Sequence, residues 1–119
     1  MSWQTRCALG IELVLCTTNE DGSPHAIMVI SGGLMNDRLV LSDCEMQTSE
    51  ANIARESRVC LVAQGDGHYY RVEGKAELHD KGRFFDLAVA HNKGSSTVKH
   101  AIVITIQAVY DLDNAVRIL

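Results

Sequence analysis

The segment YYRVEGKAELH, residues 69–79, alternates between two kinds of side chain, and this alternation constrains the fold more than any other feature. One set of alternate positions, from Tyr70 to Leu78, is apolar or small, whereas the other set, from Arg71 to His79, is charged. Successive side chains of a β-strand point to opposite faces of the sheet, while a helical pattern would repeat every 3.6 residues. The segment is therefore predicted to be a half-buried strand.

Five other segments have the composition of strands, and turn signals separate several of them. They are IELVLCTT (11–18), HAIMVIS (25–31), RLVLSD (38–43), RVCLVAQ (58–64) and HAIVITIQAV (100–109). The Asp21-Gly22 pair between the first two is a hairpin signal. The stretch GGLMND (32–37) is interpreted as a turn-rich connector before the third. With residues 69–79, the sequence predicts six strands in short, antiparallel connections.

Two helices are expected to interrupt the strands. The first covers about residues 48–56, between the third and fourth strands. The second is GRFFDLAVAHN (82–92), in which Phe84, Leu87, Ala88 and His91 recur at helical spacing. A further short helix is expected within the first eight residues.

Six antiparallel strands with a few short helices favour a small closed barrel, with Greek-key or up-and-down connections, because a barrel leaves no exposed strand edges. No linker or repeat interrupts the chain, so residues 1–119 are expected to form one mainly β domain. The second faces of HAIMVIS and HAIVITIQAV are also largely apolar, which predicts a further buried surface outside the barrel core. We expect this surface to be a homodimer interface.

Composition and charge exclude several classes of protein. The net charge of −4 argues against a non-specific nucleic-acid binder, which needs a basic surface. No apolar stretch is long enough to span a membrane, and the N-terminal residues lack a signal-peptide pattern. The four cysteines show no C-x-x-C pair, so we interpret them as reduced packing residues of a cytoplasmic protein.

Sequence spacing identifies no catalytic machinery. The five histidines are not spaced like metal ligands, so no metal site is expected, and no Ser/His/Asp arrangement can be located. The chain contains neither G-x-G-x-x-G nor a P-loop. The catalytic residues are therefore left unassigned.

The segment CEMQTSEANIARESRV (44–59) places hydrogen-bonding side chains at the expected start of the first helix. A helix N-terminus offers unpaired N–H groups and the positive end of the helix dipole, so it can bind a phosphate. The same residues can also simply cap the helix. Because caps are far commoner than phosphate sites, the residues alone favour the cap.

Four segments together resemble the flavin-binding split-barrel family, which includes pyridoxamine 5'-phosphate oxidase and the flavin reductases. They are LCTTNEDGSPHAIMVI, MQTSEANIARESRVCLV, YRVEGKAEL and AIVITIQAV, and the resemblance covers about residues 13–109. Within the family it is strongest to the small FMN-binding proteins of sulfate-reducing bacteria. The most specific part is TSEANIARESRV, where the family has Lys-Thr-x-x-Asn, an Arg-rich helix and a strand. The resemblance implies a dimeric six-stranded split barrel with FMN in a groove at the subunit interface.

The resemblance also implies the residues that bind the cofactor. Gln47 and Thr48 stand at the Lys-Thr pair that holds the phosphate, and Asn52 stands at the asparagine of the family. The isoalloxazine ring is expected along Met28, Val29 and Ile30. The ribityl chain is expected beside Ser42 and Asp43. The implied function is electron transfer or flavin-dependent oxidoreduction, with a redox partner protein in the first case.

Two departures from the family pattern bear on the cofactor. Gln47 replaces a lysine, which turns a charge-assisted bond to phosphate into a neutral one and weakens binding by about tenfold. Met28-Val29-Ile30 replaces a polar stretch, so side-chain hydrogen bonds to the cofactor are absent there. The open alternatives are another cofactor, either a deazaflavin or a haem with His79 or His91 as axial ligand, or a cofactor-free dimeric binding domain. Cys44 beside the groove is either a reactive thiol or a small packing residue.

Overall fold

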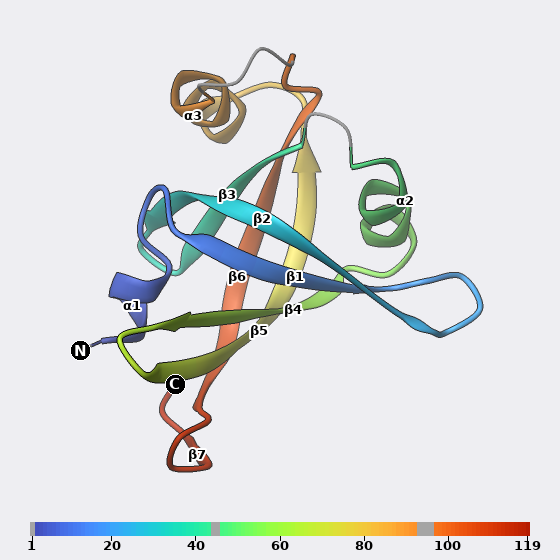
Figure 1. Cartoon of the computed structure of the whole chain (residues 1–119). Coiled ribbons are helices and arrows are strands. Elements are labelled where there is room, and N and C mark those ends of the chain that lie inside the picture. The colour runs from blue at the N-terminus through green and yellow to red at the C-terminus, as the bar shows by residue number, and fades with distance from the viewer. Residues whose placement is uncertain (1, 44–45, 93–96) are drawn as a thin grey trace.

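Six strands close into an antiparallel barrel because β3 pairs with two neighbours, β2 and β6 (Figure 1). This computed structural model describes residues 2–43, 46–92 and 97–119. The strands are β1 (Glu12–Thr18), β2 (Pro24–Met35), β3 (Arg38–Asp43), β4 (Arg58–Gly65), β5 (His68–His79), β6 (His100–Asp111) and the two-residue β7 (Val116–Arg117). The helices are α1 (Trp3–Arg6), α2 (Gln47–Arg55) and α3 (Arg83–His91).

The strand order is β3-β2-β1-β4-β5-β6, and the β3–β6 pairing joins its two ends. The chain between β3 and β4, which carries α2, therefore passes over two intervening strands, as in a Greek key. The mainly β, six-stranded antiparallel split barrel expected from the sequence is confirmed. The two-residue β7, which extends the sheet from β6, was not predicted.

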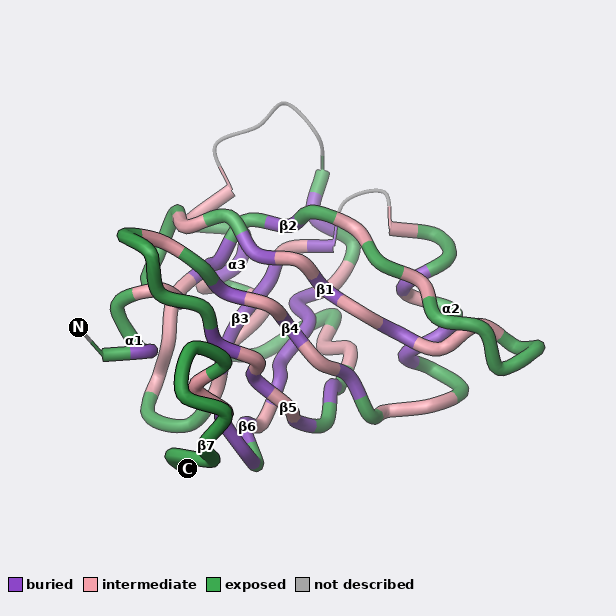
Figure 2. The backbone as a smooth tube through the Cα atoms, turned by 60° about the horizontal axis from the view of Figure 1, so that its bottom comes forward, coloured by how far each residue is buried: buried purple, intermediate pink, exposed green. Residues whose placement is uncertain are grey.

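The barrel interior takes alternate residues from every strand. In β5 the buried positions are Tyr70, Val72, Gly74 and Ala76, as the alternation predicted. They pack with the fully buried Leu13, Leu15, Leu61, Ile102 and Ile104 of β1, β4 and β6. Figure 2 shows buried and more exposed residues alternating along these strands. At one barrel end Ile53 of α2 joins this core.

The second face of β6 packs against α3 of the same chain. Ala101 and Val103 form a separate apolar cluster with Val40 of β3, Ala88 of α3 and Val98. Residues 101–104 are thus buried on both faces, with α3 as the cover of the second face, whereas on that face Thr105 is half-buried and Gln107 is exposed. Among the described residues, nothing comparable covers the apolar outer face of β2, where Met28 and Ile30 are exposed.

The prediction of a connector over GGLMND is wrong for residues 32–35, where β2 continues to Met35, and only Asn36 and Asp37 form the turn before β3. The pairing register with β3 shifts between Ser31 and Leu34, which marks a β-bulge at Gly32 and Gly33. A Cβ on Gly32 would lie 2.8 Å from the carbonyl oxygen of Val40, and Gly33 has a φ of +103°. The bulge therefore requires both glycines.

Both longer helices lie within one residue of their predicted ranges, and α1 confirms the short N-terminal helix. The Asp21-Gly22 hairpin is also confirmed, with Gly22 at a φ of +88°. In the described ranges no helix has both the length and the apolar character needed to cross a membrane.

Candidate functional site

A groove of about 940 Å³ runs along β2, and this size is typical of small-molecule sites. Its walls come from the α1–β1 loop, the end of β3, the residue before α2 and the end of α3. The described residues that line it are Leu9, Gly10, Met28, Val29, Ile30, Ser31, Gly32, Ser42, Met46, Ala90, His91 and Asn92.

Ser31 fixes one wall of the groove to β2. Its hydroxyl donates a hydrogen bond of 2.7 Å to the carbonyl oxygen of Cys7, and its backbone N–H donates to the carbonyl of Ile11 at 2.8 Å. Gly10 N–H in turn donates to the Ser31 carbonyl at 2.8 Å. Ser31 is buried, so these bonds are shielded from water and hold the α1–β1 loop in place.

The end of α3 forms the opposite wall and is bound to the barrel at two points. The Ser42 hydroxyl of β3 donates to the carbonyl of Ala88 at 3.1 Å. The Nδ1 atom of His91 lies 3.2 Å from the carbonyl oxygen of Gly32. Because a carbonyl can only accept, this contact places the proton of a neutral His91 on Nδ1 and leaves Nε2 as an acceptor.

The described walls of the groove are apolar and almost uncharged. Among its described lining residues there is no Lys, Arg, Asp or Glu, and His91 is the one ionisable side chain. Met28 and Ile30 are 61% and 64% exposed, whereas Val29 points into the barrel core. Such walls favour a flat apolar ligand that is oriented by backbone groups.

The start of α2 lies beside this groove, next to Met46. Gln47 and Thr48 of its first turn are exposed, so their side chains are free to meet a ligand. The side chain of Met46, the N-cap residue, makes no capping hydrogen bond to the helix. Instead the Asp43 carboxylate accepts a hydrogen bond of 3.0 Å from the Met46 N–H.

Two carboxyl groups, Asp43 and Glu50, lie close together beneath this helix start. Burial raises the pKa of Asp43, and a hydrogen bond with Glu50 raises it further. The pKa of Glu50 is lowered, first by that hydrogen bond and then by Lys99, whose Nζ lies 3.1 Å from Glu50 Oε2. Of the two carboxyl groups, Asp43 is therefore the more easily protonated and Glu50 the more easily ionised.

Asn52 faces away from the groove, toward the end of β1. Its Nδ2 donates to Thr17 Oγ1 at 3.0 Å and to Asn19 Oδ1 at 2.9 Å. Arg55 donates to Asn52 Oδ1 at 3.0 Å and also to the carbonyl of Thr18. Asn52 is only 3% exposed, so these bonds fix α2 to the β1–β2 hairpin.

The structure brings together half of the residues that the resemblance implied. Met28, Val29, Ile30 and Ser42 line one groove. The other four, Asp43, Gln47, Thr48 and Asn52, are not among its described lining residues. Cys44 lies outside the described residues.

Sequence reasoning missed the walls built by Leu9, Gly10 and Asn92, because irregular segments carry no periodic signal. The Gly32-Gly33 pair was the available clue, since bulges often occur next to sites. Of the two histidines considered as haem ligands, His91 lines the groove. His79 instead contacts the Phe84 ring and Glu77.

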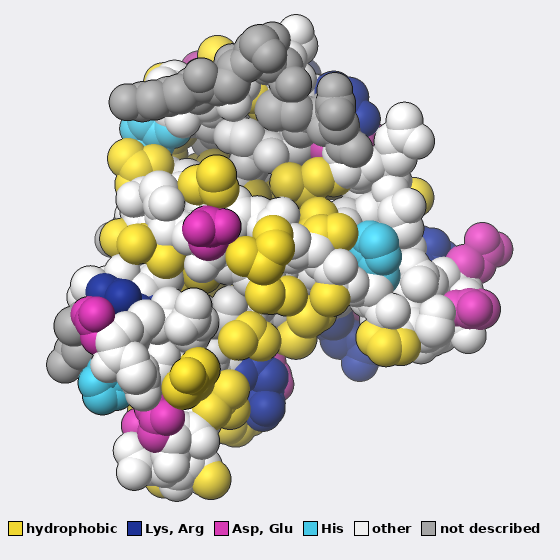
Figure 3. Space-filling view, viewed as in Figure 1, with side chains coloured by type: hydrophobic (Ala, Val, Ile, Leu, Met, Phe, Trp, Pro, Cys, Tyr) yellow, Lys and Arg dark blue, Asp and Glu magenta, His cyan; other side chains and the backbone are white. Residues whose placement is uncertain are grey.

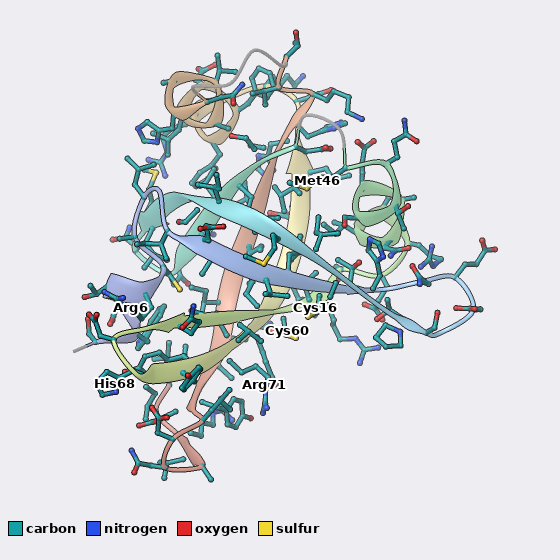
Figure 4. All side chains as sticks on the ribbon, in the orientation of Figure 1. Arg6, Cys16, Met46, Cys60, His68 and Arg71 are labelled. Atoms are coloured by element: carbon teal, nitrogen blue, oxygen red, sulfur yellow. The ribbon has the colours of Figure 1, made fainter. Side chains whose placement is uncertain are left out.

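An apolar outer face crosses β2, β1 and β4 beside the groove. The pairing register places Val14 opposite both Met28 and Val62, and Cys16 opposite both Ala26 and Cys60. Figure 3 shows the apolar side chains as a band across the middle of this view. Figure 4 places Cys16 and Cys60 next to each other on it, with Arg71 beyond Cys60. We call the residues Val14, Cys16, Ala26, Met28, Ile30, Cys60 and Val62 the outer face.

Several solved structures share this fold, and their names refer to different ligands or to none. HupZ of Group A Streptococcus aligns with a TM-score of 0.82 and 15% identity over 91% of this chain and 90% of its own. An FMN-binding protein from Syntrophomonas wolfei aligns at 0.74 and 11%, over 97% and 80%. A heme binding protein from Mycobacterium smegmatis aligns at 0.67 and 20%, over 89% of this chain and 49% of its own. At these identities the likeness establishes the fold.

A comparison with curated proteins gives no match. The family model described as pyridoxamine 5'-phosphate oxidase matches residues 12–113. That range begins with the first residue of β1 and ends just past β6, so it contains the whole barrel, both longer helices and most of the groove. The chain belongs to the pyridoxamine 5'-phosphate oxidase family.

Proposed function

We propose that this chain is a homodimeric FMN-binding flavoprotein that acts in electron transfer or as a flavin-dependent oxidoreductase. One observation carries the proposal. Met28, Val29, Ile30 and Ser42, which the family resemblance assigns to the flavin, all line the same groove. The exposed side chains among them, Met28 and Ile30, are apolar, so they suit the flat ring of a flavin.

The groove and the first turn of α2 suit the flavin ring of FMN better than they suit its phosphate. The first turn of α2 offers backbone N–H groups, the Thr48 hydroxyl and the Gln47 amide, all suited to an anion. The Glu50 carboxylate in the same turn opposes an anion, and no Lys or Arg stands in the described residues 46–54. We therefore expect FMN to bind about tenfold more weakly than it does where a lysine stands at position 47.

A bound flavin would supply the redox chemistry, and the chain would supply its surroundings. Met28 and Ile30 would exclude water from one side of the ring, and the loop held by Ser31 would limit access to the groove. This division explains why no acid–base pair stands out among the described lining residues.

A second copy of the chain is the proposed cover of the outer face. Met28 and Ile30 remain well exposed in one chain, and their neighbours across β1 and β4 are apolar as well. Contiguous apolar patches of this kind mark protein interfaces. Because Met28 and Ile30 belong to both the outer face and the groove, the second copy would also close the groove.

Titration of the purified apo-protein with FMN and with riboflavin tests the cofactor proposal. FMN should bind saturably at one molecule per chain, and Thr48→Ala should weaken FMN but leave riboflavin, which lacks the phosphate, unchanged. A dissociation constant for FMN above about 1 mM, a binding free energy weaker than about 4 kcal/mol, would reject the proposal.

Sedimentation of the wild type and of two charged variants tests the dimer. The 13.1 kDa chain should sediment at twice its mass. Ile30→Asp on the outer face should give monomers. The matched control is Val116→Asp, which changes a 50% exposed residue of β7 outside that face and should remain dimeric. A monomeric wild type contradicts the proposed interface.

Haem is the second candidate, because His91 has the arrangement of many metal-binding histidines. Its Nδ1 is engaged by the Gly32 carbonyl, which fixes the tautomer that leaves Nε2 available to bind a metal. Haem binding would give a Soret band that is shifted or lost in His91→Ala. If haem, FMN and a deazaflavin all fail to raise the melting temperature, the cofactor-free dimeric binding domain remains.

A further inference from the structure

Three ligand-type side chains meet where β3 ends, β6 begins and α2 starts. Figure 4 labels Met46, the residue just before α2. Asp43 of β3 and His100 of β6 are partners in the strand register, and Glu50 lies on the first turn of α2. One carboxylate oxygen of each acid and one ring nitrogen of His100 lie within 4.8 Å of one another. Three separate elements therefore direct donor atoms toward one point.

The distances from His100 to the two carboxylates are long for ion pairs. His100 Nδ1 lies 3.4 Å from Asp43 Oδ2 and 3.5 Å from Glu50 Oε2. Charge-assisted hydrogen bonds between nitrogen and oxygen are usually about 2.7–2.9 Å long. Ligand atoms about 2.0–2.1 Å from a tetrahedral zinc ion lie about 3.3–3.4 Å apart. The two distances from His100 Nδ1 match the edges of a zinc tetrahedron more closely than they match direct hydrogen bonds, whereas Asp43 and Glu50 are hydrogen-bonded to each other.

The surroundings hold the carboxylate of Asp43 in a fixed orientation. Its Oδ1 accepts the Met46 N–H at 3.0 Å, which leaves Oδ2 facing His100. Supporting hydrogen bonds of this kind orient metal ligands in known sites. Asp43 is fully buried, and His100 and Glu50 have side chains 26% and 28% exposed, so an ion could enter from the His100 and Glu50 side.

Lys99 is the cation that now faces the cluster. Its Nζ lies 3.1 Å from Glu50 Oε2, and its side chain is 43% exposed. A divalent ion would take over the charge compensation of Glu50, and the lysine could turn toward solvent.

We infer that Asp43, Glu50 and His100 form a binding site for a divalent transition-metal ion, with zinc the best fit and a fourth position open to water. A set of one imidazole and two carboxylates suits zinc and excludes the soft ions that need thiolates. The site requires no flavin, and it adjoins the first turn of α2 that is proposed for the phosphate. Sequence spacing could not reveal it, because the ligands come from positions 43, 50 and 100.

Zinc binding to EDTA-treated protein, measured by calorimetry and by metal content after gel filtration, tests the inference. The wild type should hold one zinc ion per chain, and His100→Gln and Glu50→Gln should each bind at least tenfold more weakly. Lys99→Gln should bind more tightly, because it removes the competing cation. The matched control is His79→Gln, since His79 also lies 3.5 Å from a glutamate oxygen, on Glu77, but lacks a third ligand.

Two further measurements keep the test decisive if a variant unfolds. In the wild type, one equivalent of zinc should shift the side-chain nitrogen resonances of His100 and leave those of His79 unchanged. Cobalt should give the ligand-field bands of a tetrahedral oxygen and nitrogen site without thiolate charge transfer. Absence of zinc binding, zinc binding that neither the His100 nor the Glu50 variant weakens, or a thiolate band would each overturn the inference.

Discussion

Replacing Asn52 with alanine should destabilise the protein without any cofactor present. The buried Asn52 amide takes part in three hydrogen bonds, to Thr17, Asn19 and Arg55. Each of the two neutral bonds contributes about 1 kcal/mol, and the partly exposed bond from Arg55 contributes about another 0.5–1 kcal/mol. Alanine recovers about 0.5 kcal/mol through its higher helix propensity. The expected net loss in the free energy of unfolding is therefore about 2 kcal/mol.

Thermal unfolding of the apo-protein at fixed concentration measures this loss. For a domain of this size, about 2 kcal/mol corresponds to a fall in melting temperature of roughly 6–10 °C. Gln47→Ala is the control, because Gln47 is an exposed residue of the same helix, and it should change the melting temperature little.

The partner variant Asn19→Ala removes one of the three bonds and should cost about 1 kcal/mol. The double variant with Asn52→Ala should cost less than the sum of the two single changes, because they share a bond. A fall of less than about 2 °C for Asn52→Ala would refute the assignment of Asn52 to the connection between α2 and the β1–β2 hairpin.

Three further outcomes are expected. A Cβ on Gly74 would lie 2.3 Å from the Thr105 carbonyl oxygen, so Gly74→Ala should lower the free energy of unfolding by about 1–3 kcal/mol. Urea unfolding measures this loss, and an unchanged midpoint contradicts the prediction. Burial raises the pKa of Cys60 to about 11, so iodoacetamide at pH 8 should label it on the order of tenfold more slowly than a free cysteine. Peptide mass spectrometry can measure the two labelling rates, and equal rates would show that the thiol is open to solvent. Hydrogen bonds from the side chain and the backbone N–H of Arg58 lower the pKa of Glu56 to about 2, so this pairing stabilises the fold above the ordinary glutamate pKa and is lost as the pH falls toward 2. In NMR titrations Arg58→Ala, which keeps the backbone bond, should raise the Glu56 midpoint part of the way toward its ordinary value, and an unmoved midpoint contradicts the pairing.

Much of the barrel could be predicted because its strands face water on one side and core on the other. The alternation in residues 69–79 and the hairpin at Asp21-Gly22 are local signals, and both were confirmed. The continuation of β2 through Gly32 and Gly33 was missed, since glycine pairs are equally typical of turns. The cover of β6 by α3 was missed because composition shows that a face is buried, but not what buries it.

The candidate site was predictable only where one strand carries it. Met28, Val29 and Ile30 are consecutive, so placing β2 beside the groove places all three. Asn52 is near Thr48 in sequence, but its side chain is buried against Thr17 and Asn19, whereas Thr48 is exposed. The wall formed by the α1–β1 loop depends on a hydrogen bond from the Ser31 hydroxyl to the Cys7 carbonyl, and no local sequence pattern predicts such a contact.

Closure of the barrel by β3 and β6 has a consequence for how the chain is made. The register pairs Arg38 with Thr105, so the second partner of β3 is β6. During translation β6 is made only after α2, β4, β5 and α3. During that interval β3 and β5 both present unpaired edges, which are templates for association with other chains. Contacts this distant in sequence also slow folding. A nascent chain of this protein is therefore most exposed to aggregation just before β6 leaves the ribosome.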